Sequence, residues 1–129
     1  MKLNHLNLIV PDLAAAQELF IGTFGFSVML RRGGALVALT GADSFTLVLA
    51  DSRCLGGDGA PQYPEGFHVG FLPETREAVD ALQARLAATA VELAHAPRTM
   101  HGSYGFYFTA LGGILFEIST WIGAGDATV

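Results

Sequence analysis

The sequence predicts an α+β fold made of two similar modules, each with the order strand, helix, strand, strand, strand (βαβββ). Three observations support this fold class. Each half of the chain opens with a short apolar strand that contains a single histidine. Each opening strand ends at a proline followed by an acidic residue, after which a helical pattern begins, as expected at a helix start. Three further apolar runs, typical of strands, follow each helix.

The first module covers about residues 1–50. Its opening strand, residues 3–10, stops at Pro11-Asp12, and a helix is predicted over residues 12–24. Apolar side chains recur in this helix at the spacing of one face, namely Leu13, Ala16, Leu19, Phe20 and Phe24. The remaining strands of the module are predicted at residues 27–30, 35–40 and 45–50.

The second module, about residues 67–122, repeats this order. Its opening strand covers residues 67–72, and its helix covers residues 74–89. Its other strands are predicted at residues 91–95, 104–109 and 114–120. Residues 51–66 are rich in Gly, Pro and Asp without a period, and are predicted to be a linker. Since one such module cannot bury the open face of its own sheet, residues 1–129 are expected to form a single domain.

Composition limits the functions of this chain. Its 129 residues are 51% hydrophobic and only 15% charged, which indicates a folded domain and not a disordered segment. The formal net charge of −5 argues against nucleic acid or an anionic membrane as a partner. The apolar stretch 6–10 is far too short to cross a bilayer. A single cysteine, Cys54, excludes a disulfide within the chain and fits the cytoplasm, where we expect this protein.

Strand periodicity separates two faces of the predicted sheets. In the first strand Leu6, Leu8 and Val10 share one side, and this apolar side should pack on the helices. His5 and Asn7 then point to the opposite, concave side. The first module therefore offers one imidazole and one amide to that side.

The second module adds a histidine and a carboxylate to the same side. His68 lies on the concave side of its strand, and so does Glu117, because Ile114, Phe116 and Ile118 alternate with it and face the helices. A carboxylate within such an apolar strand is costly to bury unless it is paired or binds a metal. Glu117 is therefore expected to have a partner.

Two imidazoles and one carboxylate suit a divalent metal with open coordination positions, such as Fe(II), Mn(II), Ni(II) or Zn(II). Taken singly, each of the three residues has a structural explanation, since a lone strand histidine is more often a satisfied polar residue and a strand glutamate can be solvated. Their agreement with one duplicated geometry favours a metal site. His95 and His101 show no such pattern, and we expect both to be exposed to solvent.

The sequence resembles the vicinal-oxygen-chelate superfamily of glyoxalases, bleomycin-resistance proteins and extradiol dioxygenases over essentially the whole chain. The resemblance is carried by the segments Leu-Asn-His-Leu at 3–6, Phe-Gly-Phe at 24–26, Phe-His-Val at 67–69, Gly-Phe-Tyr-Phe at 105–108 and Gly-Ile-Leu-Phe-Glu at 113–117. It implies a cup-shaped mixed sheet formed by the two modules around a metal, with helices on the outer face. It also implies that the ligands are His5, His68 and Glu117.

The resemblance further implies a homodimer. In small members of this superfamily, the two modules that close one site often come from different subunits. His5 of one chain would then meet His68 and Glu117 of the other.

Several positions distinguish the activities found in this superfamily. Val48 stands where glyoxalase I supplies a fourth ligand, which argues against that activity. Extradiol dioxygenases share the three ligands and a tyrosine ten positions before the glutamate, which Tyr107 matches, and they add an acid–base histidine, for which His101 is the candidate. Fosfomycin-modifying relatives also use two histidines and a glutamate, but Asn7 replaces their usual threonine and residues 98–104 do not match their potassium loop.

These features together predict a divalent-metal-dependent enzyme that acts on a small oxygen-bearing substrate by bidentate chelation. Tyr107 is the candidate catalytic residue, as a hydrogen-bond donor to a developing oxyanion, although a half-buried strand aromatic is an equally simple explanation. The candidate substrate-binding residues are Asn7, His101 and Arg98, and the last could hold an anionic group. The alternative is a protein that sequesters a small molecule or an antibiotic without catalysis, as bleomycin-resistance proteins do.

Overall fold

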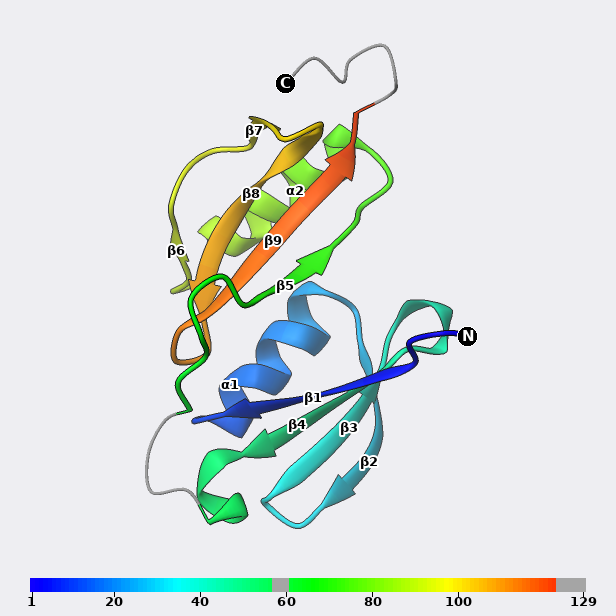
Figure 1. Ribbon diagram of the computed structural model, residues 1–129, viewed down its shortest axis with the longest axis vertical. Helices are drawn as coiled ribbons and strands as arrows, with labels where there is room; N and C mark the ends of the chain where they lie inside the picture. Colours follow the sequence, from blue (N-terminus) through cyan, green and yellow to red (C-terminus); the bar gives the residue numbers. More distant parts are fainter. Residues whose placement is uncertain (57–60, 123–129) are drawn as a thin grey trace. The chain divides into compact units, whose positions relative to one another are not determined.

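The computed structural model describes residues 1–56 and 61–122 of the chain. The chain forms two compact units, Met1–Gln62 and Tyr63–Val129, each with its own mixed sheet and its own α-helix (Figure 1). The predicted α+β class is confirmed, and the first unit has the predicted βαβββ order, while the second unit has one more short strand after its helix. In the described part of the chain, no helix has both the length and the apolar character needed to cross a membrane.

The first unit contains a four-stranded sheet in the order β1-β4-β3-β2, in which β1 and β4 are parallel and the other pairs are antiparallel. Its strands are β1 (His5–Val10), β2 (Ser27–Arg32), β3 (Leu36–Thr40) and β4 (Thr46–Asp51). The helix α1 (Leu13–Gln17) continues directly into a π-helix, Glu18–Thr23. Short 3-10 turns, Ala42–Ser44 and Ser52–Leu55, precede and follow β4.

The first helix begins where the sequence indicates. The Asp12 side chain accepts a hydrogen bond from the Ala15 backbone N–H at 3.0 Å and so satisfies one of the free donors at the helix start. The predicted uninterrupted helix over residues 12–24 differs in its second half, which widens into the π-helix. There Leu19 and Phe20, which are adjacent in sequence, are both buried. The apolar side of β1 is buried as predicted, with Leu8 and Val10 almost fully inaccessible.

The second unit contains a sheet in the order β5-β9-β8-β6, with a further short strand, β7, also paired to β8. Its strands are β5 (His68–Phe71), β6 (Glu92–Leu93), β7 (Arg98–Met100), β8 (Ser103–Ala110) and β9 (Ile114–Trp121). The helix α2 (Arg76–Ala87) contacts β6, β8 and β9. β5 is parallel to β9, and the other pairs are antiparallel.

One face of this second sheet forms the core beneath α2. Phe106 and Phe108 of β8 and the predicted residues of β9 are buried on this face, and the rings of Phe108 and Phe116 stack with centroids 4.9 Å apart. From α2, the buried side chains are Val79 and Leu86. Because side chains alternate along a strand, the intervening residues of β8 and β9 belong to the opposite, open face.

Two boundaries in the second unit differ from the prediction. The helix starts at Arg76 and not at residue 74, because the Thr75 hydroxyl, and not the preceding proline and acid, caps it by accepting from the Ala78 N–H at 3.1 Å. The strand predicted over residues 91–95 contains only the two residues of β6. Pro97, which has no N–H to donate, lies between β6 and β7.

The short strand β7 was not predicted. It forms a hairpin with β8 in which Arg98 pairs with Gly105 and Met100 pairs with Ser103. Its turn residues, His101 and Gly102, both have positive φ, 49° and 78°. Arg98, expected in a loop, therefore belongs to a strand, and His101 lies in a tight turn.

Candidate functional site

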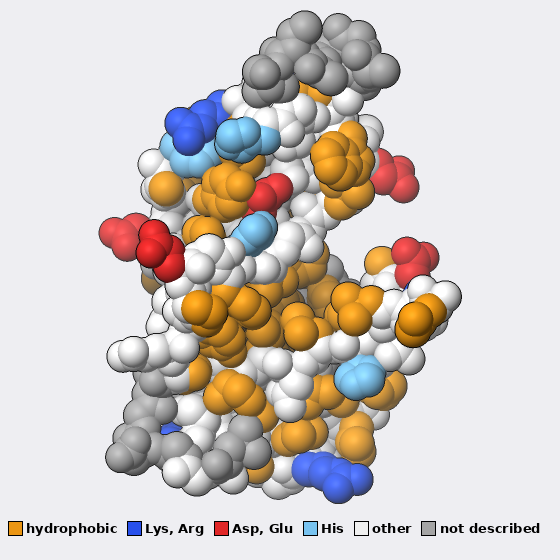
Figure 2. Space-filling model, viewed as in Figure 1, with side chains coloured by type: hydrophobic (Ala, Val, Ile, Leu, Met, Phe, Trp, Pro, Cys, Tyr) orange, Lys and Arg blue, Asp and Glu red, His pale blue; other side chains and the backbone are white. Residues whose placement is uncertain are grey.

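The open face of the second sheet, opposite α2, gathers the polar side chains of this unit. The register of the strands places Tyr107 beside Glu117 on this face, and His68 and Thr109 on either side of Leu115. Figure 2 shows histidine side chains close to a carboxylate and to hydrophobic side chains on the visible face of this unit. Imidazole, carboxylate and phenol groups are thus brought together by three neighbouring strands, β5, β9 and β8.

His68 and Glu117 face each other. The His68 Nε2 atom lies 3.7 Å from the Glu117 Oε1 atom. The other ring nitrogen of His68, Nδ1, lies 2.9 Å from the Gly66 carbonyl oxygen. Since a carbonyl can only accept, Nδ1 carries a proton, and in the neutral ring Nε2 presents its lone pair toward the carboxylate. Two electron-rich atoms that face each other at this distance suit a shared cation or proton.

Glu117 is held in its charged form. Its Oε2 atom accepts a hydrogen bond from the Ser119 hydroxyl at 2.7 Å, and the Tyr107 hydroxyl also donates to this carboxylate. Burial by itself would raise the pKa of Glu117, but these two hydrogen bonds, with His68 and His101 nearby, hold the pKa below its usual range. The expectation that this carboxylate needs partners is confirmed.

Tyr107 lies at the centre of the open face. The hydrogen bond to Glu117 raises the pKa of the Tyr107 phenol, and burial and the charge of that carboxylate raise it further. The hydroxyl therefore stays protonated at neutral pH and remains a donor. The rings of His68 and His95 flank the Tyr107 ring, each with its centroid 6.3 Å away and in edge-on geometry.

His95 is a residue of this face that the sequence did not reveal. It was expected to be exposed to solvent, but it is half-buried against Tyr107. Its Nδ1 atom lies 2.8 Å from the Ala96 carbonyl oxygen, so in the neutral ring Nε2 is the free nitrogen. No periodicity marks this position, since β6 has already ended. His101 is exposed, as expected.

His5 belongs to the first unit, at the start of β1. Its Nδ1 atom lies 2.7 Å from the Asn4 Oδ1 atom, which can only accept, so this ring also carries its proton on Nδ1 and leaves Nε2 free. Asn7, two residues further on, is exposed and pairs with Val48 of β4. Within residues 1–56 and 61–122, no three His, Cys, Asp or Glu side chains of the chain lie together as a metal site.

The two histidines and Glu117 nevertheless have the donor chemistry that a divalent metal requires. Metal-binding histidines commonly donate their second N–H to a backbone carbonyl or a similar acceptor, which orients the ring. His5 and His68 both show this arrangement, and the Glu117 carboxylate is oriented by Ser119. Neutral imidazoles and a carboxylate fit Fe(II), Mn(II), Ni(II) or Zn(II).

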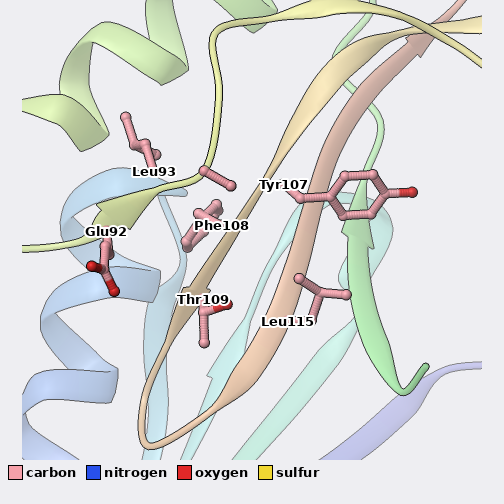
Figure 3. A pocket seen from close by; sticks show the side chains of 7 residues that line it. Glu92, Leu93, Tyr107, Phe108, Thr109 and Leu115 are labelled. Atoms are coloured by element: carbon pink, nitrogen blue, oxygen red, sulfur yellow. The ribbon is translucent and has the colours of Figure 1, made fainter. Parts of the chain in front are cut away.

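A pocket of about 240 Å³ lies next to Tyr107 at the β6 edge of the sheet (Figure 3). It is lined by Glu92, Leu93, Ala94, Tyr107, Phe108, Thr109 and Leu115. The side chains of Tyr107 and Leu115 project to the same side in Figure 3, as their positions on one sheet face require. Arg98, predicted to bind substrate, is exposed on β7 and does not line this pocket.

Comparisons with known proteins place this geometry in context. The family model described as Glyoxalase/Bleomycin resistance protein/Dioxygenase superfamily matches residues 2–118. A comparison with curated protein sequences gave no significant match. Among solved structures, a possible glyoxalase from Bacillus cereus is 34% identical, with 92% of this chain and 97% of that chain covered and a TM-score of 0.77.

Two further structures share the fold at lower identity. The lactoylglutathione lyase from Agrobacterium tumefaciens is 22% identical over 92% of both chains, with a TM-score of 0.71. The genomically encoded fosfomycin resistance protein from Listeria monocytogenes is 21% identical over 95% of both chains, with a TM-score of 0.76.

Proposed function

Because the chain belongs to the glyoxalase/bleomycin resistance protein/dioxygenase superfamily, we propose that it is a divalent-metal-dependent enzyme acting on a small oxygen-bearing substrate. One observation carries the proposal. The His68 Nε2 and Glu117 Oε1 atoms face each other at 3.7 Å, while the second nitrogen of the ring is already held by the Gly66 carbonyl. An ordinary surface histidine has no need of this arrangement, but a metal ligand does.

In this proposal His68, Glu117 and His5 hold the metal. The metal supplies Lewis acidity toward two adjacent oxygens of the substrate. The identity of the ion is left to measurement, since the donor set accepts several. The first-unit residue His5 is proposed to come from a second copy of the chain, in a homodimer.

Tyr107 supplies the protein's own hydrogen-bond chemistry at this site. Its hydroxyl donates to Glu117 and has a raised pKa, so it keeps its proton at neutral pH. A substrate oxygen that gains negative charge near this face can accept the same hydrogen bond, which stabilises the charged species. Tyr107 thus acts as a donor and not as a base in this proposal.

A second function, binding without catalysis, is favoured by a separate observation. In the described residues of the chain, Glu117 is already satisfied by two hydroxyls and no third metal donor joins it and His68. A protein that sequesters a small molecule or an antibiotic would need only the apolar pocket and this hydrogen-bonded carboxylate. The two functions differ in whether the protein retains metal.

Metal content tests the proposal directly. The protein purified without an affinity tag, after incubation with Fe(II), Mn(II), Ni(II) or Zn(II) and removal of excess ion, should retain nearly one equivalent per chain by mass spectrometry. The His68→Ala and Glu117→Gln variants should each weaken metal binding by about 100-fold or more, since each removes a direct ligand.

The matched control is Glu77→Gln, which removes an exposed carboxylate from α2 on the other face of the sheet. This control should retain metal like the parent. A parent protein that retains no ion from any of these four incubations would overturn the enzyme proposal, and small-molecule binding would then be the function to screen.

A further inference from the structure

The pocket beside Tyr107 indicates what the substrate carries beyond its reacting oxygens. We propose that this pocket, between β6, β8 and β9, holds an apolar arm of the substrate that ends in an amine. The inference rests on the proposed function for the reacting end of the substrate, and it adds the chemical class of the other end.

The pocket lies directly beside the two proposed metal ligands of this unit, His68 and Glu117. Leu115 lines the pocket and pairs with His68, and Tyr107 lines the pocket and pairs with Glu117. Cross-strand neighbours have their Cβ atoms about 4.5–5.5 Å apart. The pocket therefore starts one cross-strand spacing away from His68 and Glu117, so a small molecule with its oxygens at these two residues can extend into it.

The walls of the pocket are suited to an apolar arm. On the open face, Leu115 and the Tyr107 ring supply aliphatic and aromatic surface, and Ala94 lines the pocket beyond the end of β6. An apolar cavity of about 150 Å³ can hold a benzene ring. The 240 Å³ of this pocket can therefore take an aromatic ring or an alkyl chain of comparable size.

The outer end of the pocket is acidic. Glu92 pairs with Thr109, so their side chains are neighbours at the end farthest from β5. Glu92 is exposed, and across residues 1–56 and 61–122 no Lys, Arg or His side chain forms an ion pair with it. A carboxylate only accepts hydrogen bonds, so this end attracts an ammonium group and repels a second carboxylate. The formal net charge of −5 acts in the same direction.

Hydroxamates that differ in the chain attached to the chelating group provide the test, because the hydroxamate group presents two adjacent oxygens to a metal. Metal-loaded protein is titrated calorimetrically with acetohydroxamate, hexanohydroxamate, 6-aminohexanohydroxamate and the carboxylate-ended chain of equal length. The six-carbon arm should tighten binding about tenfold over acetohydroxamate. The amine-ended probe should bind at least about fivefold more tightly than the carboxylate-ended one, a difference that falls with added salt.

Two variants assign these effects to the pocket. Glu92→Gln should abolish the preference for the amine, whereas Glu77→Gln, which removes the same charge from α2, should keep it. Leu115→Ala should reduce the gain from the longer arm while acetohydroxamate binding changes less than about twofold. Equal affinity for all four probes, or an amine preference that survives Glu92→Gln, would overturn the inference.

A metal-free measurement separates this inference from the proposed function. Hexylamine and hexanoate, which lack a chelating head, are added to metal-free protein and followed by amide chemical shifts. Hexylamine should shift the amides of Leu93, Thr109 and Leu115 and hexanoate should not. Shifts spread over both units would overturn the inference. If these local shifts appear but no hydroxamate binds the protein incubated with metal, the pocket is as inferred and the metal proposal fails.

Discussion

The smallest features that bear on the proposed function are single hydrogen bonds to ring nitrogens. Asn4 holds Nδ1 of His5, and the Gly66 carbonyl holds Nδ1 of His68. In both rings the same nitrogen is left free. The two residues differ in one respect, because the acceptor for His68 is backbone and cannot be mutated away, whereas the acceptor for His5 is a side chain.

The side-chain acceptor leads to a prediction about metal affinity. Asn4→Ala should weaken Zn(II) binding by about 10- to 100-fold, because the His5 ring loses the partner that orients it, whereas Asn4→Asp should bind at least as tightly as the parent. Competition titration against a chromophoric chelator measures both. Asn7→Ala removes an amide that has no bond to His5 and should change the affinity less than twofold. An Asn4→Ala variant that binds like the parent would remove Asn4 from the site.

At the scale of elements, the last strand of the first unit ends at an ion pair with the residue two positions further on. In the first unit, Asp51 at the end of β4 is 3% exposed and binds Arg53 through both carboxylate oxygens, at 2.7 and 3.0 Å. These hydrogen bonds, with that from the Arg53 N–H, lower the pKa of Asp51 to about 2.

This lowered pKa predicts how stability depends on pH. A carboxylate whose pKa is lower in the folded chain stabilises the fold above its ordinary pKa, and the stabilisation is lost as pH falls through the folded value. The unfolding free energy of the parent should therefore decrease between about pH 4 and pH 2 more steeply than that of Asp51→Asn, measured by urea denaturation. Glu74→Gln, at an exposed position, should keep the parent's slope. Parallel curves for the parent and Asp51→Asn would contradict the prediction.

In the second unit, β8 and β9 approach closely at Gly105. A Cβ atom at this position would overlap the Ile118 carbonyl oxygen and lie 2.7 Å from the Ser119 Cα atom. Ser119 donates to Glu117, so the close approach of the two strands also sets the position of the proposed ligand.

Gly105→Ala should therefore destabilise the protein by about 1–3 kcal/mol, because backbone atoms on β9 must move to admit the methyl group. Gly70→Ala is the matched control, since Gly70 lies in the same sheet, on β5, and no atom lies within 4 Å of a Cβ built there. Chemical denaturation of the three proteins gives the comparison. A Gly105→Ala protein as stable as Gly70→Ala would show that the strands can separate freely.

At the scale of the whole molecule, the proposed ligands are divided between two units. His68 and Glu117 lie in the second unit, and His5 lies in the first. The proposed homodimer, in which His5 of one chain joins the other two ligands of its partner, makes a quantitative prediction about mixtures of variants.

The His5→Ala protein and the Glu117→Ala protein should each bind no metal when tested separately. When the two variants are refolded together, the mixture should recover part of the parent's metal binding. Random pairing makes half of the dimers mixed, and each mixed dimer has one intact site of two, so metal binding should return to about a quarter of the parent's value. A mixture of two preparations of His5→Ala is the control and should recover none. If the variant mixture also recovers none while the parent binds metal, the site is built within one chain or the chain is not a dimer.

The sequence was sufficient to predict the parts of this protein that depend on local patterns. Alternating apolar residues identified the buried faces of β1 and β9, and thereby placed His5 and Glu117 on the opposite faces of these strands, because neighbours in a strand always point to opposite sides. The Asp12 cap marked the start of α1. Short segments such as Phe-His-Val at 67–69 and Gly-Ile-Leu-Phe-Glu at 113–117 gave the resemblance to the family whose model matches residues 2–118.

Tertiary structure decided the features that depend on residues distant in sequence. The position of His95 against Tyr107 follows from the path of the chain between β6 and β7, and no period records that path. The strand β7 forms by pairing with β8, and no pattern within residues 98–100 predicts it. The pocket is formed by residues of three strands, whose separation no local pattern specifies. Periodicity determines which way a side chain points, but only the packed sheet determines what it meets.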